Sequence, residues 1–318
     1  MLKTSLIGAV TLACALGASA QTSINLANYR LSGNHALATL GGMSLEASAV
    51  TDARDRGTLF FVGDEGHGVV EISRTRQTLG SMAFGNWPAA SSNHDAEGLT
   101  YLGNGQLVVA EERLQDALRF TFLAGGSVAL ANAPTVSIGT TVGNIGTEGI
   151  SYDPRDGSFV SVKQNAPQAV LGGRLNFATG TSTMTALFDA SLLGLASLSD
   201  IQTLAPVDAL AGSAAADNLL ILSLDSRRLV EVNRAGRVLG FFDLSGITSQ
   251  AIEGVTVDEL GTIYLVAEDS GTPNSRLFVL TAVTAVPEPE TYALMLGGLG
   301  GLGVLAWVAR RRQARKAA

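Results

Sequence analysis

The sequence predicts an all-β fold, a five-bladed β-propeller spanning residues 21–285. First, a carboxylate that opens a short apolar strand recurs about every 50 residues, and each repeat continues with further strand-like segments and turns. Second, the chain has 37 glycines among 318 residues and only 15% charged residues, which is typical of β structure with many tight turns. A period near 50 residues with about four short strands in each unit is typical of propeller blades.

The repeat is clearest from Asp95 to Phe122, in the sequence DAEGLTYLGNGQLVVAEERLQDALRFTF. Glu97 opens the strand GLTYL, an Asn-Gly turn leads to the strand QLVVAEE, and ALRFTF follows as a third strand. Five opening carboxylates lie 51, 51, 52 and 53 residues apart: Glu46, Glu97, Glu148, Asp200 and Glu253. A six-bladed ring is the alternative if residues 86–93, or the Ala/Gly-rich insertion at 207–217, contain a degenerate blade.

The fifth repeat lacks a fourth strand of its own, because the chain reaches Pro287 soon after Thr281. The segment NYRLSG, which starts at Asn28, resembles a strand and precedes the first repeat. We expect it to pair as the outer strand of the last blade, which would cover an exposed edge and join the two ends of the body. A loose N-terminal arm is the alternative.

The N-terminus has the pattern of a secretory signal peptide. Lys3 precedes an apolar run at residues 6–16, and small residues follow it up to Ala20. We predict that signal peptidase removes residues 1–20, so that the mature chain begins at Gln21. A lipoprotein signal acylated at Cys14 is the alternative. Because Cys14 is the only cysteine, the body has neither a disulfide nor a thiolate metal site.

Residues 286–318 form a separate C-terminal module. A Pro-Glu-Pro motif (Pro287, Glu288 and Pro289) precedes 19 uncharged residues, 291–309, which are long enough for a transmembrane helix. An arginine-rich end follows, so we expect an anchor in the inner membrane with the body on the periplasmic side.

This module resembles the PEP-CTERM sorting signal. The resemblance implies cleavage by an exosortase near the motif, delivery to the cell surface or outside the cell, and an envelope linked to exopolysaccharide or biofilm. A plain anchor with a proline-rich stalk is the alternative.

Three segments of the body resemble the SdiA-regulated domain family: LEASAVTDARDRGTLFFVGDE from Leu45, DAEGLTYLGNGQLVVAEER from Asp95, and AIEGVTVDELGTIYLVAEDS from Ala251. The resemblance covers about residues 28–281 and implies a β-propeller found in exported bacterial proteins. Esterase-like phytases, which act on phosphate esters, are related propellers that share the Glu-Gly opening. The fourth repeat departs from this pattern, because Asp200-Ile201 replaces Glu-Gly.

The charge of the body excludes one class of partner. Without Lys3 and the five bases of the last nine residues, 15 bases remain against 28 acids, of which 26 lie in residues 21–285. Nucleic-acid binding requires a basic surface, so we expect no nucleic-acid partner.

The opening carboxylates are candidate metal ligands, because the first strand of each blade lines the channel and its start lies at one mouth. Five converging carboxylates would repel one another. Water and neighbouring donors, protonation, or a bound cation would relieve that repulsion. Oxygen ligands alone favour Ca²⁺ or Mg²⁺, with Ca²⁺ as the predicted cofactor. The predicted ligands are Glu46, Glu97, Glu148, Asp200 and Glu253. Alternatively, each carboxylate caps backbone N–H groups of the neighbouring blade.

A second polar set follows the second strands and is expected on the same face. An acidic mouth with one lysine suits a cation or a hydroxyl-rich ligand better than a bare phosphate. The predicted ligand-binding residues are Asp64, Glu65, Glu111, Glu112, Lys163, Asp225, Glu268 and Asp269. His94 and Asp95 are weak candidates for a general base pair. The segments 52–57 and 153–157 are interpreted as hairpin turns rather than calcium loops.

Two functions are compatible with these features. The first is a non-enzymatic, exported propeller that binds an envelope ligand such as polysaccharide, with a divalent cation at the channel mouth. The second is a metal-dependent phosphoesterase of the phytase kind that uses the same acids. The first is favoured because the acids lack a basic clamp for phosphate.

Overall fold

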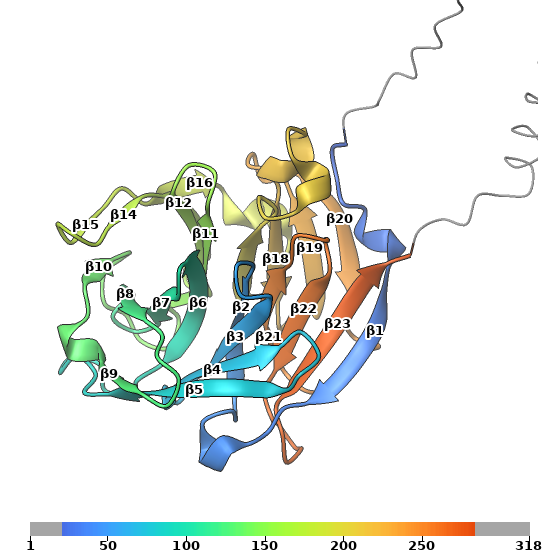
Figure 1. Cartoon of the computed structure of the whole chain (residues 1–318). Coiled ribbons are helices and arrows are strands. Elements are labelled where there is room, and N and C mark those ends of the chain that lie inside the picture. Colours follow the sequence, from blue (N-terminus) through green and yellow to red (C-terminus); the bar gives the residue numbers. More distant parts are fainter. Residues whose placement is uncertain (1–20, 284–318) are drawn as a thin grey trace, which may run out of the picture. The chain divides into compact units, whose positions relative to one another are not determined.

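The computed structural model describes residues 21–283 (Figure 1). The predicted signal peptide, the Pro287–Pro289 motif and the predicted transmembrane helix lie outside these residues. Among the residues described, no helix has the length and apolar character of a membrane span.

Five antiparallel sheets radiate around a common axis, which confirms the five-bladed propeller (Figure 1). From the axis outward, blade 1 contains β2 (Ala47–Ala53), β3 (Thr58–Gly63), β4 (Gly68–Ser73) and β5 (Thr78–Gly85). Blade 2 contains β6 (Ala96–Gly103), β7 (Gln106–Glu111), β8 (Asp116–Thr121) and β10 (Thr135–Ser137). Blade 3 contains β11 (Thr147–Asp153), β12 (Ser158–Lys163), β13 (Ala169–Gly173) and β16 (Thr185–Phe188). Blade 4 contains β17 (Asp200–Thr203), β18 (Leu219–Ser223), β19 (Arg228–Val232) and β20 (Val238–Asp243). Blade 5 contains β21 (Ile252–Val257), β22 (Ile263–Ala267), β23 (Arg276–Ala282) and β1 (Tyr29–Ala36).

Three short strands add to this plan. β9 (Ser127–Ala129) pairs in parallel with β5 at the outer edge of blade 1, and β14 (Leu175–Asn176) and β15 (Thr181–Ser182) form a separate hairpin. The 3₁₀ helices are η1 (Leu26–Asn28), η2 (Leu40–Gly42), η3 (Leu130–Asn132), η4 (Ala190–Leu193), η5 (Asp208–Leu210) and η6 (Ala214–Asp217). The insertion at 207–217 therefore contains η5 and η6 rather than a blade, and residues 86–93 contain no strand.

The N-terminal strand closes the ring as predicted. β1 pairs antiparallel with β23, with Tyr29 opposite Ala282 and Ala36 opposite Arg276. The Tyr29 hydroxyl also donates a hydrogen bond to the carbonyl of Gly261 at 2.8 Å. The predicted Asn104-Gly105 turn joins β6 to β7, and both residues have positive φ (53° and 75°), as a two-residue hairpin turn requires.

The core lies between adjacent blades rather than along the axis. Each innermost strand contributes one large apolar side chain to a different buried cluster between two sheets, and these residues are Val50, Leu99, Ile150, Ile201 and Val255. Polar side chains are thereby left for the channel, which sets the position of the candidate site.

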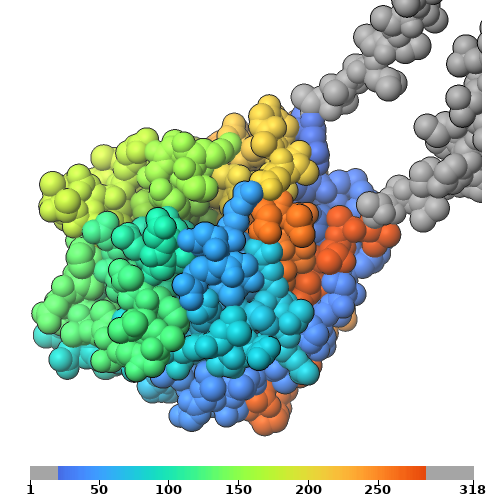
Figure 2. Space-filling view, viewed as in Figure 1, coloured from blue at the N-terminus to red at the C-terminus, as the bar shows by residue number. Residues whose placement is uncertain are grey.

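The segment that precedes β1 is fastened to blade 4 by a buried glutamate. The Glu231 carboxylate accepts hydrogen bonds from the Ser23 hydroxyl at 2.5 Å, from the Ile24 N–H at 3.1 Å and from the Asn218 side-chain amide at 2.7 Å. In Figure 2 the N-terminal residues (blue) lie beside the orange residues of blade 5. The N-terminal segment therefore bridges blades 4 and 5.

Candidate functional site at the two mouths of the channel

A belt of polar side chains lines the channel, one from each innermost strand. Neighbouring blades bond to one another there: Tyr101 N–H donates to Thr51 Oγ1 (3.1 Å), Tyr152 N–H to Thr100 Oγ1 (2.9 Å), Thr203 N–H to Ser151 Oγ (3.1 Å) and Asp52 N–H to Thr256 Oγ1 (3.0 Å). The Thr256 hydroxyl also donates to Gln202 Oε1 at 3.1 Å. We call Thr51, Thr100, Ser151, Gln202 and Thr256 the belt, and it fixes the equivalent positions of the five blades.

The belt shows that two of the five predicted opening carboxylates are not equivalent to the others. Three residues before the belt stand Glu97, Glu148 and Glu253, but the same position holds Ser48 in blade 1 and Ser199 in blade 4. The strand register agrees, because the pairing of the first two strands shifts at Ser48 as it does at the three glutamates. The alignment that made Glu46 and Asp200 equivalent to these glutamates is therefore wrong. It is shifted by two residues in blade 1 and by one residue in blade 4.

Asp200 performs the capping role that was the alternative for all five carboxylates. It is buried, and its carboxylate accepts the N–H of Val255 in the neighbouring blade and its own strand's Ile201 N–H, both at 2.7 Å. Gly149 of blade 3 makes room for it, since a Cβ there would lie 2.4 Å from Asp200 Oδ1. Burial raises the pKa of Asp200 well above its usual value, while the two N–H donors lower it.

Glu46 lies just before β2, in the connection that leads into the innermost strand of blade 1. Its backbone has a positive φ of 52°, and its N–H donates to the Asp269 carboxylate at 2.9 Å. Burial, together with nearby acids of which Glu65 is the strongest, raises the pKa of Glu46.

The remaining three opening glutamates pair with acids of the second predicted set at the acidic mouth of the channel. Glu97 is hydrogen-bonded to Asp64, Glu148 to Glu112, and Glu253 to Glu268. We call these six residues the acidic mouth. The structure therefore brings three members of the first predicted set beside three members of the second.

In each pair, burial raises the pKa of the opening glutamate well above its usual value. Burial raises the pKa of Glu97 well above its usual range, and the negative charges of Glu148, Glu253 and Asp64 raise it further. Burial also raises the pKa of Asp64, but the hydrogen bond with Glu97 lowers it. Burial likewise raises the pKa of Glu112, whereas the Gly146 N–H and the hydrogen bond with Glu148 lower it. The raised pKa values of the opening glutamates favour their protonated form, which lowers the negative charge of the mouth.

The other members of the second set have separate partners. The buried Glu111 carboxylate accepts the Ser91 hydroxyl and the Leu114 N–H, both at 2.6 Å. The Lys163 ammonium donates to the backbone carbonyl of Asn165. Glu65 is exposed and lies 3.7 Å from His67, and Asp225 is exposed in blade 4. Within residues 21–283 none of these four side chains forms a hydrogen bond or an ion pair with the six acids of the acidic mouth.

The two weak catalytic candidates are held by different neighbours. The His94 ring stacks on Trp87, with centroids 5.4 Å apart and an interplanar angle of 8°. The Asp95 carboxylate forms an ion pair with Arg113. Within residues 21–283 no hydrogen bond joins His94 to Asp95, and no group of three or more His, Cys, Asp or Glu side chains is arranged to hold a metal ion. The Ca²⁺ site stays a prediction.

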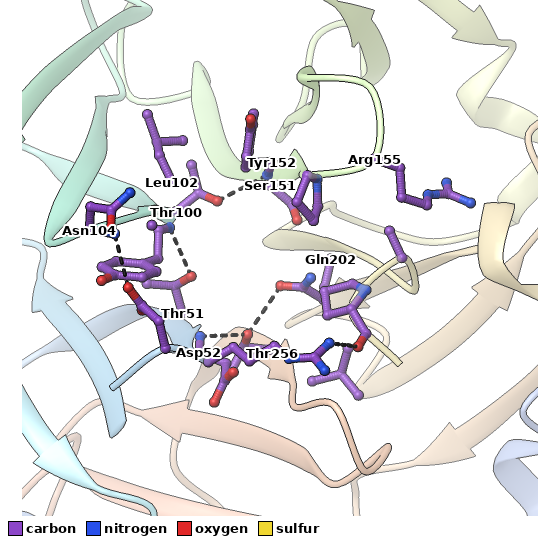
Figure 3. A pocket seen from close by; sticks show the side chains of 18 residues that line it. Thr51, Asp52, Thr100, Leu102, Asn104, Ser151, Tyr152, Arg155, Gln202 and Thr256 are labelled. Atoms are coloured by element: carbon purple, nitrogen blue, oxygen red, sulfur yellow. Dashed lines mark hydrogen bonds between the residues drawn. The ribbon is translucent and has the colours of Figure 1, made fainter. Parts of the chain in front are cut away.

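A cavity of about 700 Å³ opens at the opposite end of the channel, beyond the belt (Figure 3). All five belt residues contribute to its wall, and Tyr101 and Tyr152 follow two of them in sequence. The segments 52–55 and 154–155 form part of the rim. The sequence predicts these segments as turns, but it does not show the cavity that they surround. One sequence feature could have indicated the cavity. The five belt residues are polar and recur along the chain at spacings of 49, 51, 51 and 54 residues.

The charged groups at the cavity are largely neutralised by one another. Arg54 donates two hydrogen bonds to Asp208 (2.8 and 2.9 Å). Arg155 forms ion pairs with Asp153 at 2.6 Å and with Asp217 at 2.9 Å. The cavity therefore presents hydroxyl groups and aromatic rings, and its two guanidinium groups are already paired with carboxylates.

The chain is thus a five-bladed β-propeller whose channel has an acidic mouth at one end and a polar cavity, large enough for a small ligand, at the other. The model of the SdiA-regulated family matches residues 21–278, and the chain belongs to that family. The model of the PEP-CTERM protein-sorting motif matches residues 285–312. This motif indicates an exported protein that is processed by an exosortase and attached to the cell envelope.

The chain is similar to several solved structures at low sequence identity. A luciferin-regenerating enzyme is 10% identical, with a TM-score of 0.48, over 79% of this chain and 96% of that one. Virginiamycin B lyase from Staphylococcus aureus, solved with quinupristin, is 14% identical, with a TM-score of 0.40, over 74% of this chain and 66% of that one. Kuenenia stuttgartiensis hydrazine synthase is 13% identical, with a TM-score of 0.40, over 75% of this chain. The match spans 59% of the hydrazine synthase chain.

Proposed function

We propose that this protein is an exported, non-enzymatic binding propeller that holds a hydroxyl-rich ligand of the cell envelope, such as a segment of polysaccharide, in the axial cavity. The observation that carries the proposal is the cavity of about 700 Å³ with polar side chains from all five blades. Its volume falls within the range of small-ligand sites, and a few placed polar groups on a partly apolar wall are the usual composition of such sites.

The position of the protein supports this ligand class. A protein that is exported and attached to the envelope meets extracellular polymers at high local concentration. The tyrosines at the wall are fixed in place, because Tyr101 stacks on Phe60 (5.7 Å, 18°) and Tyr152 packs against Phe159 (5.1 Å, 50°). Rigid aromatic rings beside hydroxyl donors provide contact area at a low entropic cost.

A phosphoesterase is less well supported by the same geometry. Phosphoryl chemistry needs cations or guanidinium groups around the developing negative charge. At the acidic mouth burial raises the pKa of Glu97, Glu148 and Glu253, and the nearby Lys163 ammonium contacts a backbone carbonyl. A Ca²⁺ ion at this mouth is a separate proposal, and binding in the cavity at the other end does not require it.

The test uses residues 21–283, which form a closed ring with a complete core. We expect polysaccharide isolated from the envelope to retain this protein in a sedimentation assay. Ala205→Trp, which fills the cavity from its rim, should abolish retention. Ala235→Trp, on an exposed turn of the same blade, is the matched control and should bind normally. If the polysaccharide retains the Ala205→Trp variant as well as the unmodified protein, the cavity is not the binding site.

The same preparation tests the alternative. A phosphoesterase should release nitrophenol from nitrophenyl phosphate in the presence of Ca²⁺, and Glu97→Ala should abolish that turnover without unfolding the protein. We expect no turnover above the buffer rate. Turnover that depends on both Ca²⁺ and Glu97 would overturn the binding proposal in favour of catalysis.

A further inference from the structure

Three hydroxyl groups of the belt have a hydrogen that the protein does not use. Thr51, Thr100 and Ser151 each accept one backbone N–H from the next blade. Within residues 21–283 none of these three hydroxyls donates to a protein acceptor, whereas the Thr256 hydroxyl donates to Gln202. All three are less than one-tenth exposed and belong to the cavity wall. Buried donors are normally satisfied, so these three call for acceptor atoms inside the cavity.

The three donors come from consecutive blades and therefore lie on one side of the axis. Figure 3 shows Thr51, Thr100 and Ser151 around the same side of the cavity, with Thr256 and Gln202 bonded to each other on the other side. A ligand with several acceptor oxygens on one edge can satisfy all three. Hydroxyl, ether and carbonyl oxygens qualify by geometry, and so do carboxylates and phosphates.

Charge selects among these acceptors. Both guanidinium groups at the cavity are committed to carboxylates, Arg54 to Asp208 and Arg155 to Asp153 and Asp217. Asp55, an exposed residue at the rim, forms no ion pair within the described part of the chain. An anionic ligand would therefore enter a cavity without a free cation and pass a negative charge at its rim, which is unfavourable at low dielectric.

We infer that the belt hydroxyls of Thr51, Thr100 and Ser151 form a subsite for one neutral sugar residue, and that acidic or phosphorylated sugars are excluded from it. This inference rests on the proposed function and narrows its ligand class. The three O–H groups donate to the ring and hydroxyl oxygens of the sugar. Tyr101 and Tyr152 at the wall provide apolar surface for its C–H groups. The carboxylate of Asp55 at the rim is available to accept a sugar hydroxyl.

Titration calorimetry of residues 21–283 tests this inference with three probes: a neutral galactan oligosaccharide, a polygalacturonate oligomer of matched length, and inorganic phosphate. We expect heat of binding from the neutral oligosaccharide alone. Thr100→Val should weaken it about five- to tenfold, the usual effect of one lost hydrogen bond. Thr203→Val is the matched control, because the Thr203 hydroxyl is buried, has no hydrogen-bond partner within the described residues and does not belong to the cavity wall, so the affinity should be unchanged.

The outcomes separate this inference from the proposed function. Tighter binding of polygalacturonate or phosphate than of the galactan would overturn the neutral subsite while leaving envelope binding intact. An equal loss of affinity in Thr100→Val and Thr203→Val would show that the loss comes from altered structure and not from a missing donor in the cavity. Failure of the envelope polysaccharide to retain the unmodified protein would sink the proposed function itself. If Thr100→Val does not fold, Ser151→Ala removes the equivalent donor of blade 3 and should give the same loss.

Discussion

The Thr256 hydroxyl accepts the Asp52 N–H at 3.0 Å and so joins the last blade of the propeller to the first, across 204 residues of sequence. The same hydroxyl donates to Gln202 in blade 4, at 3.1 Å. One side chain therefore connects three blades. Thr51, Thr100 and Ser151 accept similar hydrogen bonds from backbone N–H groups of the following blade. The ring is therefore closed at the axis as well as at its outer edge, where β1 pairs with β23.

The first prediction concerns this closure. Thr256→Val keeps the shape of the side chain but leaves the Asp52 N–H and the Gln202 side chain without their partner. We expect the free energy of unfolding to fall by about 1–3 kcal/mol, the range for a buried polar group that loses its partner. Urea denaturation of residues 21–283 measures it. Thr256→Ser retains the hydroxyl and should cost clearly less, so equal losses in the two variants would contradict the role given to this bond.

The second prediction concerns the N-terminal segment. Glu231 is fully buried, and it accepts hydrogen bonds from Ser23, Ile24 and Asn218. Because hydrogen bonds to a charged group are worth about 1.5–3 kcal/mol, Glu231→Ala should lower the free energy of unfolding by at least that amount. It should also free the N-terminal segment, which amide hydrogen exchange of residues 22–28 would detect. Glu65→Ala, on an exposed loop, is the control and should change stability by about 0.5 kcal/mol or less. Unchanged exchange in Glu231→Ala would show that the segment is held elsewhere.

The third prediction concerns Gly149, which packs against Asp200 of the next blade. A methyl group at this position would lie 2.4 Å from Asp200 Oδ1 and 2.7 Å from its Cα, so backbone must move to admit it. We expect Gly149→Ala to cost about 1–3 kcal/mol through overpacking. Gly143→Ala is the matched control, because nothing lies within 4 Å of its added Cβ. Thermal unfolding of the two variants compares them, and equal melting temperatures would contradict the packing described.

The repeat alone was enough to predict the blades, because a strand opening every 50 residues specifies both the period and the order of the sheets. The closing role of β1 followed from a simple count, since the fifth repeat lacked a fourth strand. The register within each opening could not be obtained this way. Glu46 and Asp200 lie within two residues of the true positions, Ser48 and Ser199, and a carboxylate is the more conspicuous match. Only the belt bonds between blades identify the serines as equivalent to the glutamates.

The cavity was missed for a related reason. The belt residues in its wall, Thr51 and Thr100 among them, are uncharged polar residues that match no motif, and the charged residues at its rim lie in segments predicted as ordinary hairpin turns. In one repeat such a residue is ordinary strand sequence. Its meaning depends on the other four blades, which place five of them around one axis.

The last prediction concerns the pH dependence of stability at the acidic mouth. The folded-state pKa values of Glu97, Glu148 and Glu253 are raised well above their usual value, chiefly by burial. The stability contributed by a group with a raised folded pKa is complete below its unfolded pKa, which is about 4.3 for glutamate. That contribution is lost as the pH rises toward the folded pKa. The melting temperature of the unmodified protein should therefore decrease from pH 5 toward pH 8.

Replacing the three glutamates by glutamine mimics their protonated form and removes this loss. We expect the Glu97→Gln, Glu148→Gln, Glu253→Gln protein to melt higher than the unmodified protein at pH 8 and to show a flatter pH profile. A Ca²⁺ ion held by these carboxylates predicts the opposite sign. In that case 1 mM CaCl₂ would raise the melting temperature of the unmodified protein at pH 8, since a ligand stabilises the state that binds it, and the glutamine variant would lose the effect. If calcium stabilises the unmodified protein but not the glutamine variant, a bound cation, rather than protonation of the glutamates, neutralises the mouth.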